Sequence, residues 1–248
     1  MFQGTNLLTF FDDATLWERF GKWIILAVVL FLAVLFIILL YNGNKKLSTK
    51  SITYAAITIA LSFVFSLLPP IFKLPQGGSI RMLVMLPLLL YAYTFGFSKG
   101  VLVCTIYGLL DMLLDPYIVH PIQAILDYPL AYAFLGFAGI FSKFKKRQIL
   151  YFVLGIVIGL TGRYICHVLS GIIFFAEYAD IVTYGTVLVY SLAYNSFVYV
   201  NGAMEIAAIL ILHFTNQLKY LIRYLRQASL YYDESYPNAD AEVENKTE

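Results

Sequence analysis

Charged residues are scarce in this chain, and hydrophobic residues dominate it. Only 13% of the 248 residues are charged, whereas 60% are hydrophobic, and the mean hydropathy is +0.77. A soluble domain has roughly a quarter charged residues and about half apolar ones. The composition therefore excludes an ordinary soluble globular protein and predicts an all-α integral membrane protein that crosses the bilayer several times.

Residues and motifs that would indicate catalysis or metal binding are also rare. The two cysteines, Cys104 and Cys166, both lie in apolar runs, which favours buried thiols, and no disulfide can be inferred. The three histidines are too scattered for a metal cluster, and the chain has no nucleophile elbow, P-loop or Gly-x-Gly-x-x-Gly motif. We therefore expect no catalytic residue, no metal and no cofactor. The net charge of +2 argues neither for nor against binding of nucleic acid, and we expect no nucleic acid as a partner.

Long apolar runs separated by polar loops predict seven membrane spans. The first run, residues 23–41, is uncharged over a length that can cross a bilayer. It follows a polar-aromatic segment, residues 1–22, that we expect to be extracellular or interfacial. Acidic residues before the run and lysines after it favour a transmembrane anchor helix over a cleaved signal peptide. Six further spans are predicted at 52–69, 80–95, 101–114, 121–141, 149–175 and 186–214.

Basic residues gather on one side of these spans. The predicted loops on that side, together with the end of the chain, contain Lys45, Lys46, Lys50, Lys99, Lys143, Lys145, Lys146, Arg147, Lys219, Arg223 and Arg226. Loops that face the cytoplasm are enriched in Lys and Arg. We therefore expect a plasma-membrane protein whose N-terminus is outside and whose C-terminus is cytoplasmic. Residues 215–230 should form a basic amphipathic helix that continues the last span, and 231–248 an acidic disordered tail.

Polar side chains at membrane depth predict a ligand pocket near the outer face. Such residues are costly in a bilayer and usually line a cavity or a path. Gln123 and Asp127 are four residues apart and share a helix face, and Ser191 and Asn195 do the same. His167 lies on a third span among aromatic residues. A carboxylate among aromatic rings suits a small, flat, cationic ligand, because both groups attract cations.

Ion pairing between helices is a simpler explanation for some of these residues. Asp127 could pair with Arg163 or His167 and merely connect two helices. Glu205 has no assigned role, and it could pair with Asn201 on its own helix.

Three other functions are compatible with the sequence. A proton-coupled secondary transporter of a small organic cation could use Asp111, Asp115 and Asp127 as a relay. A membrane enzyme could use an Asp/His pair. A binding or scaffold protein that does not transport could depend on the helix at 23–41.

Two small residues on the first core span raise the question of a docking face. Ala56 and Ala60 are four residues apart, and small residues at this spacing let another helix approach closely. On spacing alone, packing within the chain is the better explanation.

Four sequence blocks, in order, resemble one known family. Residues 74–90, 115–141, 163–179 and 190–195 are similar to the thiamine-specific S component of energy-coupling factor (ECF) transporters, the ThiT family. The resemblance covers residues 52–214. It implies a six-helix S-component bundle, here preceded by one additional N-terminal transmembrane helix. It also implies that the chain captures thiamine at the outer face, is not an enzyme, and docks on a transmembrane coupling protein with two ATPase subunits.

The resemblance and the polar pattern together assign roles to individual residues. Asp127 falls on the family's central acid, and Phe175 stands where a stacking tryptophan is usual. The expected substrate-binding residues are Asp127, Tyr128, His167, Phe175, Tyr190, Asn195, Tyr117, Gln123 and Ser191. The expected lid loop consists of Gln76, Gly77, Gly78 and Ser79. Ala56 and Ala60 match the family's docking motif, which favours docking on a partner over internal packing.

Overall fold

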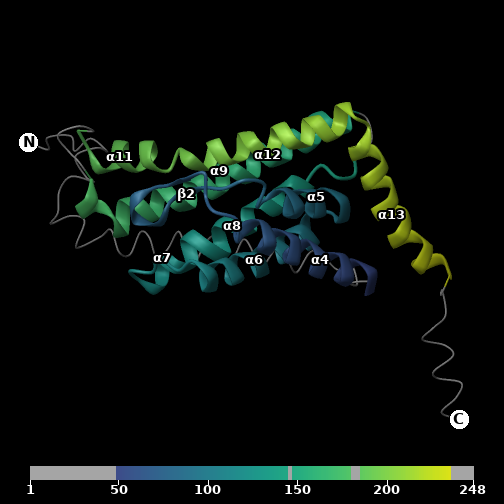
Figure 1. Cartoon of the computed structure of the whole chain (residues 1–248), viewed down its shortest axis with the longest axis horizontal. Helices are drawn as coiled ribbons and strands as arrows, with labels where there is room; N and C mark the ends of the chain where they lie inside the picture. The colour runs from purple at the N-terminus through teal and green to yellow at the C-terminus, as the bar shows by residue number, and fades with distance from the viewer. Residues whose placement is uncertain (1–48, 145–146, 180–184, 236–248) are drawn as a thin grey trace, which may run out of the picture.

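The computed structural model describes residues 49–144, 147–179 and 185–235, and side chains from 227 onward are not described. Within these residues the long helices run side by side in one bundle (Figure 1). The segment 1–22 and the predicted anchor helix 23–41 lie outside the described residues.

Six helical segments build the bundle in the described part of the chain. They are α4 (Thr49–Ser66), α5 (Leu86–Phe95), α6 (Phe97–Leu114), the interrupted helix 121–139, α9 (Gln148–Phe174), and the pair α11 (Val187–Tyr194) and α12 (Phe197–Phe214). Four stretches, 49–66, 97–114, 148–174 and 187–214, are long and apolar enough to cross a membrane, and α5 is a shorter apolar helix. The expectation of an all-α six-helix membrane bundle is therefore confirmed.

Small residues allow the central helices to approach one another closely. A Cβ atom at Gly136 would lie 2.4 Å from the backbone nitrogen of Val101 on α6, and one at Gly159 of α9 would lie 2.6 Å from the Phe134 carbonyl oxygen. Real Cβ atoms do not approach that closely. Helices in membranes pack through such small residues, so this sequence fixes α6, the interrupted helix and α9 as the centre of the bundle.

The helix at 121–139 changes its winding where the predicted central acid lies. It consists of α7 (Pro121–Ile125), the π-helical turn η3 (Leu126–Leu130), α8 (Ala131–Leu135) and the 3₁₀ turn η4 (Gly136–Gly139). Pro129 lies inside η3 and has no N–H to donate, which explains why the regular α-helical pattern breaks there. Asp127 and Tyr128 belong to this turn, and single π turns occur often at functional sites.

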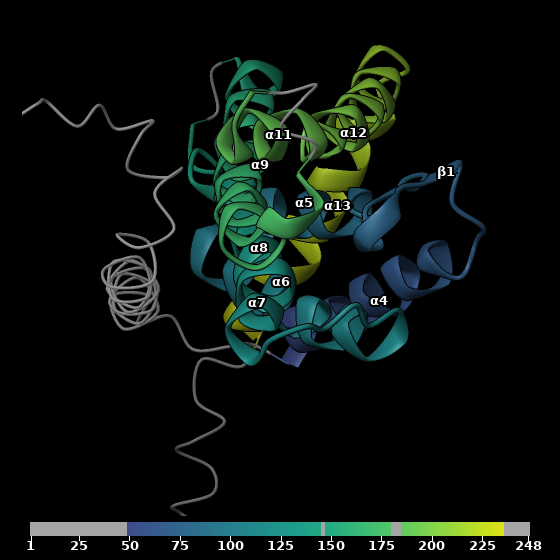
Figure 2. The same ribbon diagram turned by 90° about the vertical axis from the view of Figure 1, so that its left-hand side faces the viewer.

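A small β-hairpin occupies the start of the span predicted at 80–95. Strand β1 (Phe72–Lys73) pairs antiparallel with β2 (Ser79–Ile80) around the 3₁₀ turn η2 (Pro75–Gly77). Viewed from one end of the bundle, the hairpin lies between α12 and α4 (Figure 2). The predicted start at residue 80 is wrong: α5 begins at Leu86, with Pro87 in its first turn, a favoured place for proline.

The helix α13 (Gln217–Ser235) closes the opposite end of the bundle. It does not continue the last span as predicted, because the chain turns at Asn216, whose φ is 61°, and α13 leaves at an angle (Figure 1). It also extends to Ser235, five residues into the predicted tail. Leu218 and Ile222 are buried against the core.

Candidate substrate cavity

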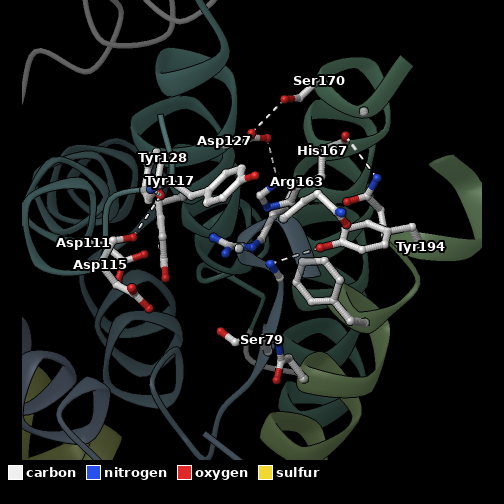
Figure 3. Close-up of a pocket in the computed structure, with 18 of the residues that line it drawn as sticks. Ser79, Asp111, Asp115, Tyr117, Asp127, Tyr128, Arg163, His167, Ser170 and Tyr194 are labelled. Carbon is white, nitrogen blue, oxygen red and sulfur yellow. Dashed lines mark hydrogen bonds and ion pairs between the residues drawn. The ribbon is translucent and has the colours of Figure 1, made fainter. Parts of the chain in front are cut away.

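A cavity is lined by the hairpin tip and the helices around it (Figure 3). The hairpin lies at the end of the bundle opposite α13 (Figure 1). The space that the centre of a water molecule can occupy is about 130 Å³, and a single water needs roughly 10–15 Å³ by that measure. The cavity is therefore large enough for a small organic molecule. Every predicted substrate-binding residue and every predicted lid residue lines it.

The Asp127 carboxylate is the centre of a hydrogen-bond network. Its Oδ2 accepts from Gln123 Nε2 and from Ser170 Oγ, both at 2.7 Å, and its Oδ1 lies 2.9 Å from His167 Nδ1. Figure 3 shows Ser170 and His167 on either side of it. The predicted pairing with His167 is therefore present, whereas the alternative pairing with Arg163 is not. The guanidinium of Arg163 instead lies over the Tyr132 ring, 4.0 Å from its centre.

The contact with Asp127 determines what His167 can offer a ligand. Nδ1 faces the carboxylate, and Nε2 is buried without a hydrogen-bond partner among the described residues. A neutral imidazole that donates from Nδ1 carries its acceptor on Nε2. His167 can therefore accept a hydrogen bond from a ligand N–H within the cavity.

The tip of the hairpin is held over the cavity by two tyrosines. The Tyr194 hydroxyl accepts a hydrogen bond from the Gly78 N–H at 3.1 Å and donates one to the Pro75 carbonyl. Gly77 has a φ of 90°, and a Cβ atom there would lie 2.8 Å from the Tyr117 Cβ. The tip thus fits closely between Tyr117 and Tyr194, in a conformation that glycine permits.

The loop that carries Tyr117 is itself held by polar contacts. The Tyr128 hydroxyl accepts from the Tyr117 N–H at 2.8 Å, and Gln123 Nε2 donates to the Tyr117 carbonyl at 3.0 Å. The Tyr117 ring lies 5.9 Å from that of Phe175. Tyr128 and Gln123 therefore position an aromatic wall of the cavity as well as lining it.

Ser191 and Asn195 join α11 to α9. Asn195 Nδ2 donates to the Ser191 carbonyl at 2.9 Å and to the His167 carbonyl at 3.2 Å, and Ser191 Oγ donates to the Val168 carbonyl at 2.9 Å. Both residues are buried. Their predicted common face is confirmed, and their hydrogen bonds also hold the helix that carries His167.

Arg81 is a cavity residue that the sequence analysis did not assign. Its side chain donates to Ser79 Oγ and to the Ser66 carbonyl, and it pairs with the half-exposed Asp115 carboxylate. Its backbone N–H donates to Asn201 Oδ1 at 3.0 Å. Because Ser66, Asp115 and Asn201 lie 15, 34 and 120 positions away, no local pattern could have indicated these three partners.

Ser170 was missed although a signal was available. It follows His167 by three positions on α9, so the two side chains share a helix face.

The predicted pairing of Glu205 with Asn201 is wrong. Asn201 Nδ2 donates to the Ser79 carbonyl in the hairpin, and Glu205 Oε1 accepts from the Met85 N–H at the start of α5, both at 3.0 Å. The hairpin and α5 lie against α12, and each side chain forms a hydrogen bond to one of their backbone groups instead of to the other side chain.

Comparison with known proteins identifies the family. The model of the thiamine transporter protein family (Thia_YuaJ) matches residues 52–222, most of the chain. The chain belongs to this family. It is 32% identical to the thiamine transporter ThiT of Bacillus subtilis (strain 168) over 183 residues, which cover 70% of this chain and 93% of that protein. It is 30% identical to ThiT of Lacticaseibacillus paracasei over 124 residues, 45% of this chain and 61% of that one.

A solved structure agrees with this result. The fold is similar to that of ThiT from Listeria monocytogenes, with a TM-score of 0.54, 27% identity, and coverage of 68% of this chain and 94% of that one. The chain is therefore a multi-pass membrane protein of the thiamine transporter family. Most of α13 and the first 51 residues lie outside the family match.

Proposed function

We propose that this chain is the thiamine-binding subunit of an ECF-type importer, and that thiamine is its ligand. The observation that carries the proposal is the Asp127 network inside an aromatic-lined cavity beneath a closed hairpin. Thiamine combines an aminopyrimidine, which donates hydrogen bonds, with a cationic thiazolium ring. A fixed carboxylate and aromatic faces complement these two parts.

The contacts support a division of roles among the cavity residues. Asp127 and His167 Nε2 accept hydrogen bonds from the aminopyrimidine, while Phe175 and Tyr117 flank a ring. Tyr190 and Asn195 complete the wall on α11. The tip formed by Gln76, Gly77, Gly78 and Ser79 opens to admit thiamine and closes over it.

Delivery requires partners in this proposal. Ala56 and Ala60 are exposed on α4, which supports a face for a transmembrane coupling protein that works with two ATPase subunits. The cavity end faces outward, and α13 with its basic residues faces the cytoplasm, which follows the positive-inside rule. The chain itself performs no catalysis.

Equilibrium binding tests the ligand assignment. Radiolabelled thiamine is titrated into the purified full chain in detergent, with riboflavin and biotin as competitors. We expect saturable binding that unlabelled thiamine displaces and the other two vitamins do not. Absence of thiamine binding would refute the proposal while leaving the family membership intact.

A proton-coupled transporter is the second candidate, because Asp111, Asp115 and Asp127 all line the cavity. Asp115, however, is engaged in ion pairs with Arg81 and Lys73 at the rim. Uptake measured while the membrane potential is collapsed and ATP is held constant separates the two. The ECF proposal predicts retained uptake, and the relay predicts its loss.

A further inference from the structure

Glu205 is a buried carboxyl group on a membrane-spanning helix, and one of its oxygens has no partner. The residue is 1% exposed and lines the cavity. Its Oε1 accepts from the Met85 N–H at 3.0 Å, whereas Oε2 is buried without a hydrogen bond in the described part of the chain. Acidic groups at membrane depth are costly and are usually retained for a function. The structure therefore leaves one carboxylate oxygen of this cavity-lining residue without a hydrogen-bond donor among the described residues.

Every other acid that lines the cavity has a basic side chain close to it. Asp127 contacts His167, Asp115 pairs with Arg81, and Asp111 interacts electrostatically with Arg163. No ion pair to Glu205 is formed among the residues that the structure describes. Glu205 is thus the one acid in the described lining that has no basic side chain of the cavity, neutral or charged, as a partner.

We propose that Glu205 is the counter-ion for the cationic ring of the bound ligand. The inference rests on the proposed function, in which that ring is the thiazolium of thiamine. A thiazolium carries a permanent charge but no N–H, so it gains from a nearby anion rather than from a directed hydrogen bond. Asp127, fixed by three donors, suits the hydrogen-bonding ring instead. In a water-poor cavity the attraction between Glu205 and the cation is much stronger than in water.

If Glu205 had a purely structural role, its replacement by glutamine would leave ligand affinity unchanged. As an acceptor for the first N–H groups of α5 it would stabilise that helix, and a glutamine could replace it because its amide oxygen also accepts. Glu205→Gln therefore keeps the contact with Met85 and removes only the charge.

The test compares two ligands on two proteins. Thiamine and a neutral isostere, in which a thiophene replaces the thiazolium, are titrated into the full-length wild type and Glu205→Gln. We expect Glu205→Gln to weaken thiamine binding by about ten- to a hundredfold, as loss of a partly buried charge pair implies. Binding of the isostere should change by less than about twofold.

The controls separate this inference from the proposed function. Asp127→Asn should weaken both ligands, since it removes a hydrogen-bond acceptor. Equal losses for both ligands in Glu205→Gln, or no loss for either, would overturn the inference. The wild type alone gives a second test that needs no variant: equal affinity for thiamine and its isostere would also overturn it. Failure of the wild type to bind thiamine at all would instead overturn the proposed function and, with it, this inference.

Discussion

At the scale of single residues, the cavity is organised by donors that converge on one carboxylate. Gln123 comes from α7, while His167 and Ser170 come from α9, so the Asp127 network also joins the interrupted helix to its neighbour. The three donors compensate for the cost of an anion at this depth. They also fix its position before a ligand arrives, which lowers the ordering cost of binding.

Replacing Ser170 by alanine removes one of these donors without altering the shape of the cavity greatly. A hydrogen bond to a charged group contributes about 1.5–3 kcal/mol, and part of that loss should reach the ligand through a less fixed carboxylate. We expect thiamine affinity to fall by about tenfold in equilibrium binding. Thr161→Ala is the control, because it removes a hydroxyl of α9 that bonds to the Val157 carbonyl and the Tyr199 hydroxyl and does not line the cavity. Wild-type affinity in Ser170→Ala would contradict this role.

At the scale of secondary-structure elements, the hairpin and α13 define the two ends of the bundle. The hairpin is fixed by its tip, through Tyr194, and by its base, through Asn201. At the other end, Arg226 donates to the carbonyls of Tyr93 and Ser142. Hydrogen bonds to backbone groups thus help to hold each end, and at the α13 end the buried Leu218 and Ile222 add to them.

A methyl group at Gly77 should prevent the hairpin from closing fully. Gly77→Ala adds a Cβ 2.8 Å from that of Tyr117 at a φ of 90°, and such strain costs on the order of 1–3 kcal/mol. We expect faster dissociation of thiamine and an affinity about tenfold lower. Gly185→Ala is a matched control, because its φ is also positive, at 75°, but nothing lies within 4 Å of the added atom. Equal effects of the two substitutions would contradict the lid assignment.

Removal of the Arg226 side chain should loosen the end of α13 that follows the buried Leu218 and Ile222. Arg226→Ala loses hydrogen bonds to carbonyl groups at the end of α5 and after η4. We expect faster amide hydrogen exchange in α13 and little change in the bundle core, since local opening follows from the loss of local contacts. Arg223→Ala, at an exposed position, should leave the exchange of α13 unchanged. Unaltered exchange in Arg226→Ala would show that other contacts hold this helix.

At the scale of the whole molecule, apolar runs were sufficient to predict the six helical segments that the structure describes, except for the start of α5. The face shared by Gln123 and Asp127 was also predictable, because it follows from helical periodicity. The hairpin could not be predicted from the sequence. Its strands are only two residues long, so they give no alternating pattern of apolar and polar residues, and nothing in the sequence indicates that Phe72 pairs with Ile80. The contacts of Arg81 and Glu205 join segments more than a hundred residues apart, and local spacing carries no information on them.

The proposed docking of the bundle on a coupling protein also concerns the whole molecule. Ala56→Trp should block close approach of another helix to α4 while leaving the cavity intact. We expect thiamine binding like that of the wild type but strongly reduced uptake in cells that contain the coupling module. Ile57→Trp, at the neighbouring exposed position on a different side of α4, should reduce uptake much less. Normal uptake by Ala56→Trp would argue against docking through this face.

The central claim is that Asp127 forms the core of a thiamine-capture site. The most direct test is equilibrium binding of radiolabelled thiamine to the wild type and to Asp127→Asn, measured side by side in detergent. Asparagine keeps the size of the side chain but removes its charge and one acceptor, so we predict a loss of at least about a hundredfold in affinity. Equal affinities of the two proteins would contradict the account.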